Sequence, residues 1–355
     1  MLEASRFVAR YHADVGKKKG EVTLKDVARL AKVSVGTVSN VLNRPTYVSE
    51  ELRSQVQEVI KKLDFEPSKD YRRYRKGRAI NIGLCLADMS NPFFMNIALS
   101  AETNARENNA GVVITQSGED FEQQERNLEL LKQHRVQGII LASVTDSEVN
   151  FRTSLPRDFP LVLIDRVPKN FQGLSVTVDD ATGGRLAGQH FRDLKFKRVA
   201  YVGSPRFSAK MKSRLDGFKT GFGQPEKSGN FSLIDVDDWN FSNGLEAGRR
   251  ILKMPKSARP RAVFCGNDYL ALGILQEMTA SNVRVPEDLA IMGYDDLPAA
   301  REAATPITSL RQPLNEIGEL SVKMLVSVIE KKKLQQKRKI VLKPELVARV
   351  STLGR

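Results

Sequence analysis

Apolar side chains recur every three or four positions over residues 24–31, 35–42 and 49–63, the spacing that places them on one face of a helix. Thr23 and Ser34 precede the first two runs and are suited to cap them. Only a short break separates these two runs. The pattern therefore predicts a helix-turn-helix domain, with a small helical bundle of another kind as the alternative.

Beyond residue 80 the pattern changes to strand-like apolar runs that alternate with helical ones. The first series of strands is INIGLCLA, GVVIT, VQGIILA and PLVLID, and a second series begins with SVTV and continues with RVAYVG, FSLIDV, RAVFC and LAIMGY. Alternating strands and helices indicate parallel sheets covered by helices. We therefore expect an α/β protein with two doubly wound parallel-sheet lobes. The first lobe is placed at 81–180 with 312–338, and the second at 181–311 with 339–355.

Charge divides the N-terminal part of the chain further. The 355 residues carry a net charge of +14, and residues 1–80 hold 18 basic against 10 acidic residues. Residues 69–78 (KDYRRYRKGR) alone hold six bases and one acid. A basic block of this kind favours a polyanionic partner, although a solvated linker is an alternative. We assign residues 1–21 to a polar extension, 22–65 to the helical domain and 66–80 to a basic hinge.

Several classes of protein are not expected from the composition. Cys85 and Cys265 lie far apart and form no CxxC pair, and the three histidines have no metal-ligand spacing. We therefore expect neither a metal nor a cofactor. No apolar run approaches the roughly 20 residues of a membrane helix, and the N-terminus has no apolar stretch typical of a secretory signal. The expected location is the cytoplasm, without contact to a membrane.

The segment TLKDVARLAKVSVGTVSNVLN, which starts at Thr23, resembles the LacI/GalR family of transcriptional regulators. The resemblance continues to LVARVST near the C-terminus and so covers nearly the whole chain. Members of this family are dimers, and some are tetramers. The resemblance therefore implies a homodimer that binds operator DNA. It also implies a small effector bound between two lobes of the periplasmic-binding-protein type.

The resemblance places base-reading positions on Val35, Gly36 and Asn40. An asparagine can pair with an adenine edge through two hydrogen bonds, and a valine can contact a thymine methyl group. Ser34, Thr37 and Ser39 are expected to contact phosphates, which set register rather than sequence. For Thr37 and Ser39, packing within the helices is the alternative.

The hinge departs from the family pattern. Tyr74 stands where the family inserts a leucine into the minor groove, and Tyr71 replaces a small residue. An aromatic side chain can still act as a wedge between base steps, and flanking arginines can follow the phosphates. The predicted DNA-binding residues are therefore Thr23, Ser34, Val35, Gly36, Thr37, Ser39, Asn40, Tyr71, Arg72, Tyr74 and Arg75.

Polar and aromatic residues follow the predicted strands where ligands bind in sheets of this type. Carboxylates, amides and guanidinium groups pair with sugar hydroxyls, and aromatic faces cover the apolar side of a sugar ring. The lobes resemble the periplasmic ribose-binding protein, and this resemblance, extended by Trp239 as an aromatic wall, selects the effector site. The predicted effector-binding residues are Asn91, Phe93, Phe94, Asp165, Arg166, Arg214, Trp239, Asn267, Asp295 and Gln312.

The predicted function is that of a DNA-binding transcriptional regulator, a repressor, whose operator affinity is controlled by ribose or a ribonucleoside. One alternative is a cytoplasmic sugar-binding protein without operator specificity. Another is an α/β enzyme with a DNA-binding head, for which the glycine-rich segment Thr182–Gly188 is the only candidate phosphate loop. That segment lacks the G-x-G-x-x-G spacing, so we interpret it as a helix packed closely on a sheet.

Overall fold

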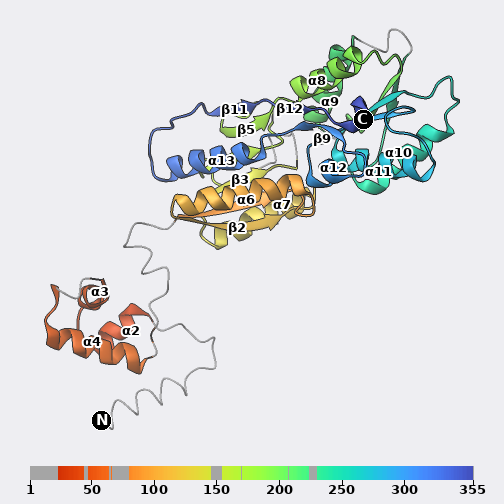
Figure 1. Cartoon of the computed structure of the whole chain (residues 1–355). Coiled ribbons are helices and arrows are strands. Elements are labelled where there is room, and N and C mark those ends of the chain that lie inside the picture. The colour runs from red at the N-terminus through yellow and green to blue at the C-terminus, as the bar shows by residue number, and fades with distance from the viewer. Residues whose placement is uncertain are drawn as a thin grey trace. The chain divides into compact units, whose positions relative to one another are not determined.

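The computed structural model describes most of the chain in two compact units, Met1–Ala79 and Ile80–Arg355 (Figure 1). The residues that it describes are 23–43, 47–63, 65, 80–144, 154–168, 170–206, 208–223 and 230–354. The predicted hinge residues Tyr71, Arg72, Tyr74 and Arg75 lie outside these ranges.

The described residues of the small unit form three helices, α2 (Leu24–Leu30), α3 (Val35–Asn43) and α4 (Glu50–Lys62). Their apolar faces meet in one core, in which Val27, Val38 and Val56 are fully buried. Gln55 on α4 donates its side-chain amide to the carbonyl of Ala31 over 3.0 Å, which fixes α4 against the turn between α2 and α3. The predicted helix-turn-helix arrangement is therefore confirmed.

The first sheet of the large unit has the strand order β11-β5-β4-β3-β1-β2, and every neighbouring pair is parallel. Its strands are β1 (Ile80–Leu86), β2 (Ala110–Gln116), β3 (Gly138–Ala142), β4 (Leu161–Ile164), β5 (Leu174–Val178) and β11 (Lys339–Leu342). Helices α6 (Pro92–Glu107) and α13 (Leu314–Ile329) cover one face, and α7 (Phe121–Gln133) covers the other.

The second sheet repeats this order as β12-β10-β9-β8-β6-β7, with only β12 antiparallel to its neighbour. Its strands are β6 (Val199–Val202), β7 (Phe231–Ile234), β8 (Ala262–Cys265), β9 (Ala290–Asp295), β10 (Thr308–Arg311) and β12 (Glu345–Val347). The helices of this lobe are α8 (Asp180–Asp193), α9 (Ala209–Phe222), α10 (Phe241–Lys253), α11 (Asp268–Ala280), α12 (Pro298–Glu302) and α14 (Val350–Leu353).

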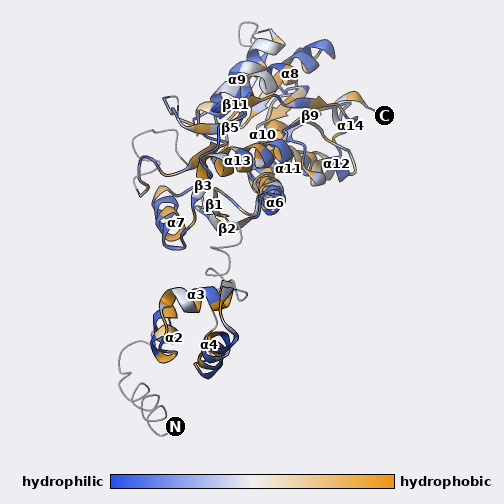
Figure 2. Ribbon diagram, turned by 90° about the vertical axis from the view of Figure 1, so that its left-hand side faces the viewer, coloured by the Kyte–Doolittle hydropathy of each residue, from blue (hydrophilic) through white to orange (hydrophobic). Residues whose placement is uncertain are grey.

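Helices cover both faces of each sheet, so the central strands are buried on both sides. This explains why their sequences are continuous apolar runs instead of alternating ones. Figure 2 shows apolar residues gathered in the strands and polar residues along the outer faces of the helices. The predicted fold class, a small helix-turn-helix domain followed by two α/β lobes, is confirmed. In the described part of the chain, no helix is long and apolar enough to cross a membrane.

One strand assignment from the sequence was wrong, and one was ambiguous. The segment SVTV was placed at the start of the second series but within the bounds of the first lobe, 81–180, and it belongs to β5, which pairs with β4 in the first sheet. Residues 339–342 were assigned to the second lobe, but β11 pairs with β5, so the chain returns to the second sheet only at Glu345. The physical reason is that β11 is a short edge strand. Its half-exposed pattern fits the edge of either sheet, so its partner is decided by tertiary packing.

Candidate effector cavity and DNA-binding surface

The start of α3 presents an exposed surface whose geometry depends on Ser34. The Ser34 hydroxyl accepts a hydrogen bond from the backbone N–H of Thr37 over 3.0 Å, and the two hydroxyl groups lie 2.9 Å apart. This capping satisfies an N–H group that the first turn of a helix leaves without a partner. Val35 keeps 42% of its surface exposed, and Gly36 beside it is also exposed.

The other predicted residues of this unit differ in exposure. Asn40 is half-buried, whereas Ser39 is buried, which favours the packing alternative for Ser39. The backbone N–H and hydroxyl of Thr23 both donate to the carboxylate of Asp26, over 3.0 and 2.6 Å. These bonds are the main cause that holds the pKa of Asp26 below its ordinary value. Thr23 therefore has a structural role in starting α2.

A cavity of about 530 Å³ lies between the two lobes of the large unit. Its size is typical of sites for small organic ligands. All ten residues predicted to bind an effector line this cavity, namely Asn91, Phe93, Phe94, Asp165, Arg166, Arg214, Trp239, Asn267, Asp295 and Gln312. They come from both lobes, and most lie at the carboxyl ends of strands, where ligands bind in sheets of this kind.

Two aspartates occupy the same place in the two sheets. Asp165 follows β4 and Asp295 ends β9, and these strands hold the same position in their strand orders. Both residues have a left-handed backbone, with φ of 65° and 108°. This conformation is uncommon for residues other than glycine, although aspartate tolerates it better than most. The turn it produces directs the chain away from the sheet as soon as the strand ends.

Asp165 forms an ion pair with Lys210, which lies in the first turn of α9 in the second lobe. Burial acts to raise the pKa of Asp165, but the charges of Lys210 and Arg166 outweigh it, and the pKa is lowered. Arg166 in turn donates to the carbonyl of Val144 over 3.0 Å and pairs with Glu119 over 2.7 Å. The first-lobe side of the cavity is therefore held by ion pairs that include a cation from the second lobe.

Arg214 forms the floor of the cavity on the second-lobe side and is only 2% exposed. Its Nε and Nη2 atoms donate to one carboxylate oxygen of Asp180, over 3.0 and 2.6 Å, and Nη1 donates to the carbonyl of Gly266. The guanidinium carbon lies 3.3 Å from the centre of the Tyr294 ring, a stacked cation–π arrangement. Burial opposes the charge of Arg214, but Asp180 more than compensates, and the pKa is raised.

Asp295 has a neutral partner instead of a cation. The side-chain amide of Gln312 donates to its carboxylate over 2.6 Å. Burial raises the pKa of Asp295 to about 6, although Arg214 and Gln312 act in the opposite direction. A carboxylate of this kind is a strong acceptor for ligand hydroxyl groups because its own protein partners leave it incompletely satisfied.

Aromatic rings form two walls of the cavity. Phe93 and Phe94 pack edge to face with their centroids 4.9 Å apart at the start of α6. Asn91 positions them by capping α6, since its side-chain oxygen accepts from the N–H of Phe93 over 3.0 Å. On the second lobe the indole of Trp239 lies against Gly266, where a Cβ atom would come within 2.6 Å of the ring. Glycine is required there by this close approach.

Asn267 supports the Trp239 wall. Its side-chain oxygen caps α11 by accepting from the N–H of Leu270 over 3.0 Å, and its amide nitrogen donates to the carbonyl of Trp239 over 2.8 Å. The side chain is 5% exposed. Asn267 therefore fixes two elements of the cavity while its remaining hydrogen-bonding capacity faces the interior.

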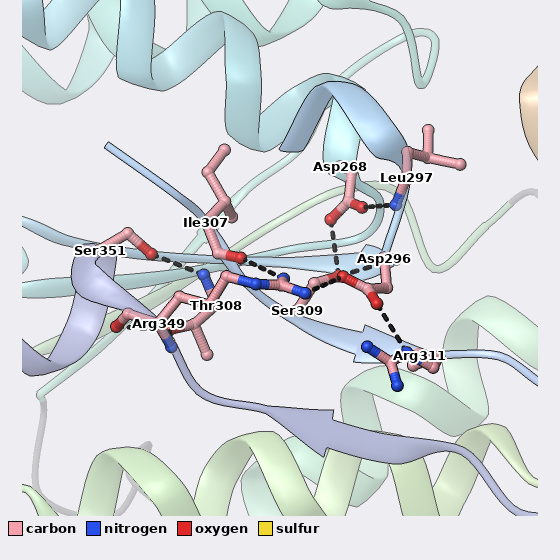
Figure 3. A network of polar contacts seen from close by, with 9 residues as sticks. All are labelled: Asp268, Asp296, Leu297, Ile307, Thr308, Ser309, Arg311, Arg349 and Ser351. Atoms are coloured by element: carbon pink, nitrogen blue, oxygen red, sulfur yellow. Dashed lines mark hydrogen bonds and ion pairs between the residues drawn. The ribbon is translucent and has the colours of Figure 1, made fainter. Parts of the chain in front are cut away.

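A buried polar network behind the cavity joins the ends of α11, β9 and β10 (Figure 3). Asp268 accepts from the N–H of Leu297 and from the hydroxyl of Ser309, each over 2.7 Å. Ser309 also accepts from the N–H of Asp296 over 3.0 Å, and the Asp296 carboxylate pairs with Arg311 and Arg349. Burial, together with the charge of Asp295, raises the pKa of Asp268 well above its ordinary value. The network fixes Asn267 and Asp295 because each directly precedes one of its members.

About half of the lining residues were not predicted from the sequence. These are Asp88, Ser90, Glu119, Lys210, Met211, Asp238, Asn240, Phe241 and Tyr269. Several lie nearer to a strand end than the predicted residue of the same connection, as Asp88 comes before Asn91 and Asp238 before Trp239. For Lys210 a signal was present, because it precedes the predicted Arg214 by four positions in a helix, a spacing that places both on one face.

The glycine-rich segment Thr182–Gly188 has a packing role. A Cβ atom at Gly184 would lie 1.9 Å from the carbonyl oxygen of Arg214, and one at Gly188 would lie 2.2 Å from that of Phe218. The glycines therefore allow α8 and α9 to approach each other backbone to backbone. The close packing that we expected is present, but its partner is a helix and not a sheet.

Comparison with known proteins agrees with this architecture. Residues 23–68 match the model for bacterial regulatory proteins of the lacI family, and residues 189–352 match a periplasmic binding protein-like domain. The ribose operon repressor of Escherichia coli K12 is 34% identical over 93% of this chain and 99% of its own length. The chain belongs to the LacI family of bacterial regulatory proteins. It is a DNA-binding transcriptional regulator with an effector-binding part, as predicted.

Other members of the LacI family are similar over nearly the whole chain. The repressor PurR of Aliivibrio fischeri is 30% identical over 94% of this chain and 99% of its own length. A lac repressor dimer bound to operator and an anti-inducer has a TM-score of 0.72 at 25% identity, over 94% of this chain and 100% of that one. A LacI-family regulator of Enterococcus faecium with bound ribose shares the fold, with a TM-score of 0.67 over 78% of this chain and 99% of that one.

Proposed function

We propose that the effector of this regulator is a neutral pentose, ribose first, or a ribonucleoside, bound in the cavity between the lobes. The observation that carries the proposal is the convergence of Asp165, Asp295 and Arg214 with two aromatic walls on a single cavity. Hydroxyl groups need both donors and acceptors, and the apolar side of a sugar ring needs an aromatic face. The name of the E. coli relative, a ribose operon repressor, supports the same effector class.

Titration calorimetry with the purified protein tests this proposal. The panel contains ribose, arabinose, glucose, adenosine, uridine and ribose 5-phosphate. We expect binding of ribose or of a nucleoside, and weaker binding of glucose, because a missing or extra hydroxyl leaves buried polar groups without partners. Binding of glucose alone would contradict the proposal.

A ribonucleoside is the second candidate because Trp239 lines the same cavity as the predicted sugar-binding carboxylates. An indole can stack on a base as well as on a sugar ring. Substitution Trp239→Leu distinguishes the two candidates. It should weaken a bound nucleoside much more than bound ribose, whereas equal loss would indicate a wall for the sugar alone.

We infer that Val35, Gly36 and Asn40 read operator bases, since they are among the exposed or half-buried positions of α3 and stand at the base-reading positions that the family resemblance gives. Substitution Asn40→Ala should lower the affinity for operator by about 1–3 kcal/mol while leaving binding to random DNA nearly unchanged. Ser39→Ala is the matched control, because Ser39 is the buried neighbour on the same helix. Equal loss on both kinds of DNA would indicate that Asn40 has no part in base recognition.

A homodimer is the proposed assembly, because the operator-bound lac repressor with the same fold is a dimer. Light scattering after size exclusion should give twice the mass of 39.7 kDa. We also expect the bound sugar to be released unaltered after long incubation, since the relatives are repressors rather than enzymes. The alternative of a sugar-binding protein without operator specificity predicts ribose binding together with equal affinity for all DNA sequences.

A further inference from the structure

Lys210 joins the two lobes across the cavity. It projects from the first turn of α9 in the second lobe and pairs with Asp165, which follows β4 in the first lobe. Its ammonium nitrogen also lies 5.5 Å from the centre of the Phe93 ring, again in the first lobe. One side chain of the second lobe thus contacts both a carboxylate and an aromatic ring of the first.

The same two groups are the ones that a sugar would use. Asp165 is expected to accept hydrogen bonds from hydroxyl groups, and Phe93 to cover the apolar side of a ring. In the ion pair the side chain of Asp165 is 8% exposed and that of Lys210 is 19% exposed. The pair is therefore largely withdrawn from water, and the Coulomb attraction between its two charges is stronger in these surroundings than at an exposed surface.

We propose that Lys210 is an internal competitor of the effector and thereby sets both its affinity and its specificity. A sugar that hydrogen-bonds to Asp165 must displace the ammonium group and offer it another acceptor. Compounds that lack either a donor for Asp165 or an acceptor for the Lys210 ammonium group do not bind at this part of the cavity. The inference rests on the proposed function, because it concerns the same cavity and the same class of ligand.

The charges around the ion pair favour a neutral ligand that displaces Lys210 over an anionic ligand that binds beside it. The other two cations of the cavity already have acidic partners, Arg166 with Glu119 and Arg214 with Asp180. Among the described residues, Asp295 adds a further carboxyl group without a cationic partner of its own. The described lining residues thus include no unpaired cation for a phosphate or carboxylate, and a neutral polyol fits the balance of charge best.

Substitution Lys210→Met tests the inference directly. Methionine keeps most of the length and the packing on Phe93 but removes the charge, so Asp165 loses its internal partner. The affinity for ribose, or for the nucleoside that wild type binds, should then increase roughly tenfold, the value of one hydrogen bond to a charged acceptor. Lys212→Met is the matched control, because Lys212 lies on the exposed face of the same helix and pairs with Asp216. It should leave the affinity unchanged.

Unchanged or weaker binding by Lys210→Met would overturn the inference, and weaker binding would make Lys210 a direct ligand of the effector. A double-mutant cycle without any effector provides a second measurement. Lys210→Met and Asp165→Asn, singly and together, should be strongly non-additive in urea unfolding of the unliganded protein. Additive effects would also overturn the inference.

These measurements separate the inference from the proposed function. If neither wild type nor Lys210→Met binds any pentose or nucleoside, the proposed effector class is wrong. The double-mutant cycle then decides whether the Lys210–Asp165 pair links the lobes. If only Lys210→Met binds a sugar, both the effector class and the competition by Lys210 are supported.

Discussion

Asp165 and Asp295 occupy equivalent places in two sheets of the same strand order, yet their partner side chains differ in charge and their pKa values shift in opposite directions. Asp165 has a cationic partner, Lys210, and its pKa is lowered. Asp295 has a neutral partner, Gln312, and burial raises its pKa to about 6. The repeated topology therefore places two carboxylates at equivalent backbone positions. Their partner side chains then determine that Asp165 is held ionised and that Asp295 is more easily protonated.

The two lobes also differ in how their cavity-lining side chains are fixed. On the second lobe Arg214, Asn267 and Asp268 are fixed by hydrogen bonds within that lobe. On the first lobe Asp165 depends on a cation that the other lobe provides. We infer that the second lobe is the preorganised side of the site, and that the first lobe completes it.

Removal of Arg214 should have the largest effect, because its charge acts on both aspartates and its side chain is almost fully buried. Substitution Arg214→Met leaves the buried carboxylate of Asp180 without its partner, and should lower the free energy of unfolding by about 3–5 kcal/mol. Effector binding should be lost as well. Urea unfolding measures the first effect, with the exposed Lys212→Met as control. Near-normal stability would contradict the role of Arg214 as the floor of the cavity.

The helix caps Asn267 in the second lobe and Asn91 in the first lobe provide a further test of this difference. Asn267→Ala removes a cap and also leaves the half-buried carbonyl of Trp239 without its donor, so it should cost about 2 kcal/mol. Asn91→Ala removes a single capping bond and should cost about 1 kcal/mol. Thermal and urea unfolding of both variants test this order. A greater loss with Asn91→Ala would show that the first lobe is the more rigid side.

The pH dependence of effector binding tests the difference between the aspartates themselves. Asp295, with a pKa of about 6, should be mostly protonated at pH 5, whereas Asp165 stays ionised. If the effector donates to the Asp295 carboxylate, its affinity should fall roughly tenfold from pH 7 to pH 5. Asp295→Asn should bind more weakly at neutral pH and lose most of this dependence. Glu119, whose pKa burial also raises, remains in this variant and serves as an internal control.

The protonation of Asp295 also affects the stability of the unliganded protein, with a defined sign. The pKa of this carboxyl group is raised above the ordinary value of 3.8, so the ionised form is disfavoured in the folded protein. The stability that Asp295 contributes is therefore fully present below pH 3.8 and is lost as the pH rises through about 6. The unliganded Asp295→Asn protein should lack this decline between pH 4 and pH 6.

Much of the site was predictable because its residues follow strands directly. Asp165 and Asn267 come within two positions of a buried apolar run, and parallel strands bring their carboxyl ends to one edge. The alternation of strands and helices predicted the two lobes for the same reason. The small helical unit was also clear, since its apolar spacing and its caps at Thr23 and Ser34 are local features.

Features that depend on contacts distant in sequence could not be predicted. The pair between Lys210 and Asp165 joins residues 45 positions apart, and neither strand ends nor motifs connect them. The partner of β11 is decided by which sheet edge is free, and a short half-exposed strand contains no information about that choice. Ser39 was assigned to a phosphate contact from its helix position alone, but burial depends on how α3 packs.

Selection of binding sites from a pool of random DNA, with and without ribose, tests whether one chain combines operator recognition with control by a sugar. We predict that the protein enriches one sequence with two related halves, and that ribose at saturating concentration changes its affinity for that sequence. Repeating the measurement with Arg214→Met should preserve the enrichment if the variant folds, and should abolish the effect of ribose. Enrichment of no sequence would contradict the account of the DNA-binding unit. An enriched sequence whose affinity is unaffected by ribose or by any ribonucleoside would contradict the account of the effector cavity.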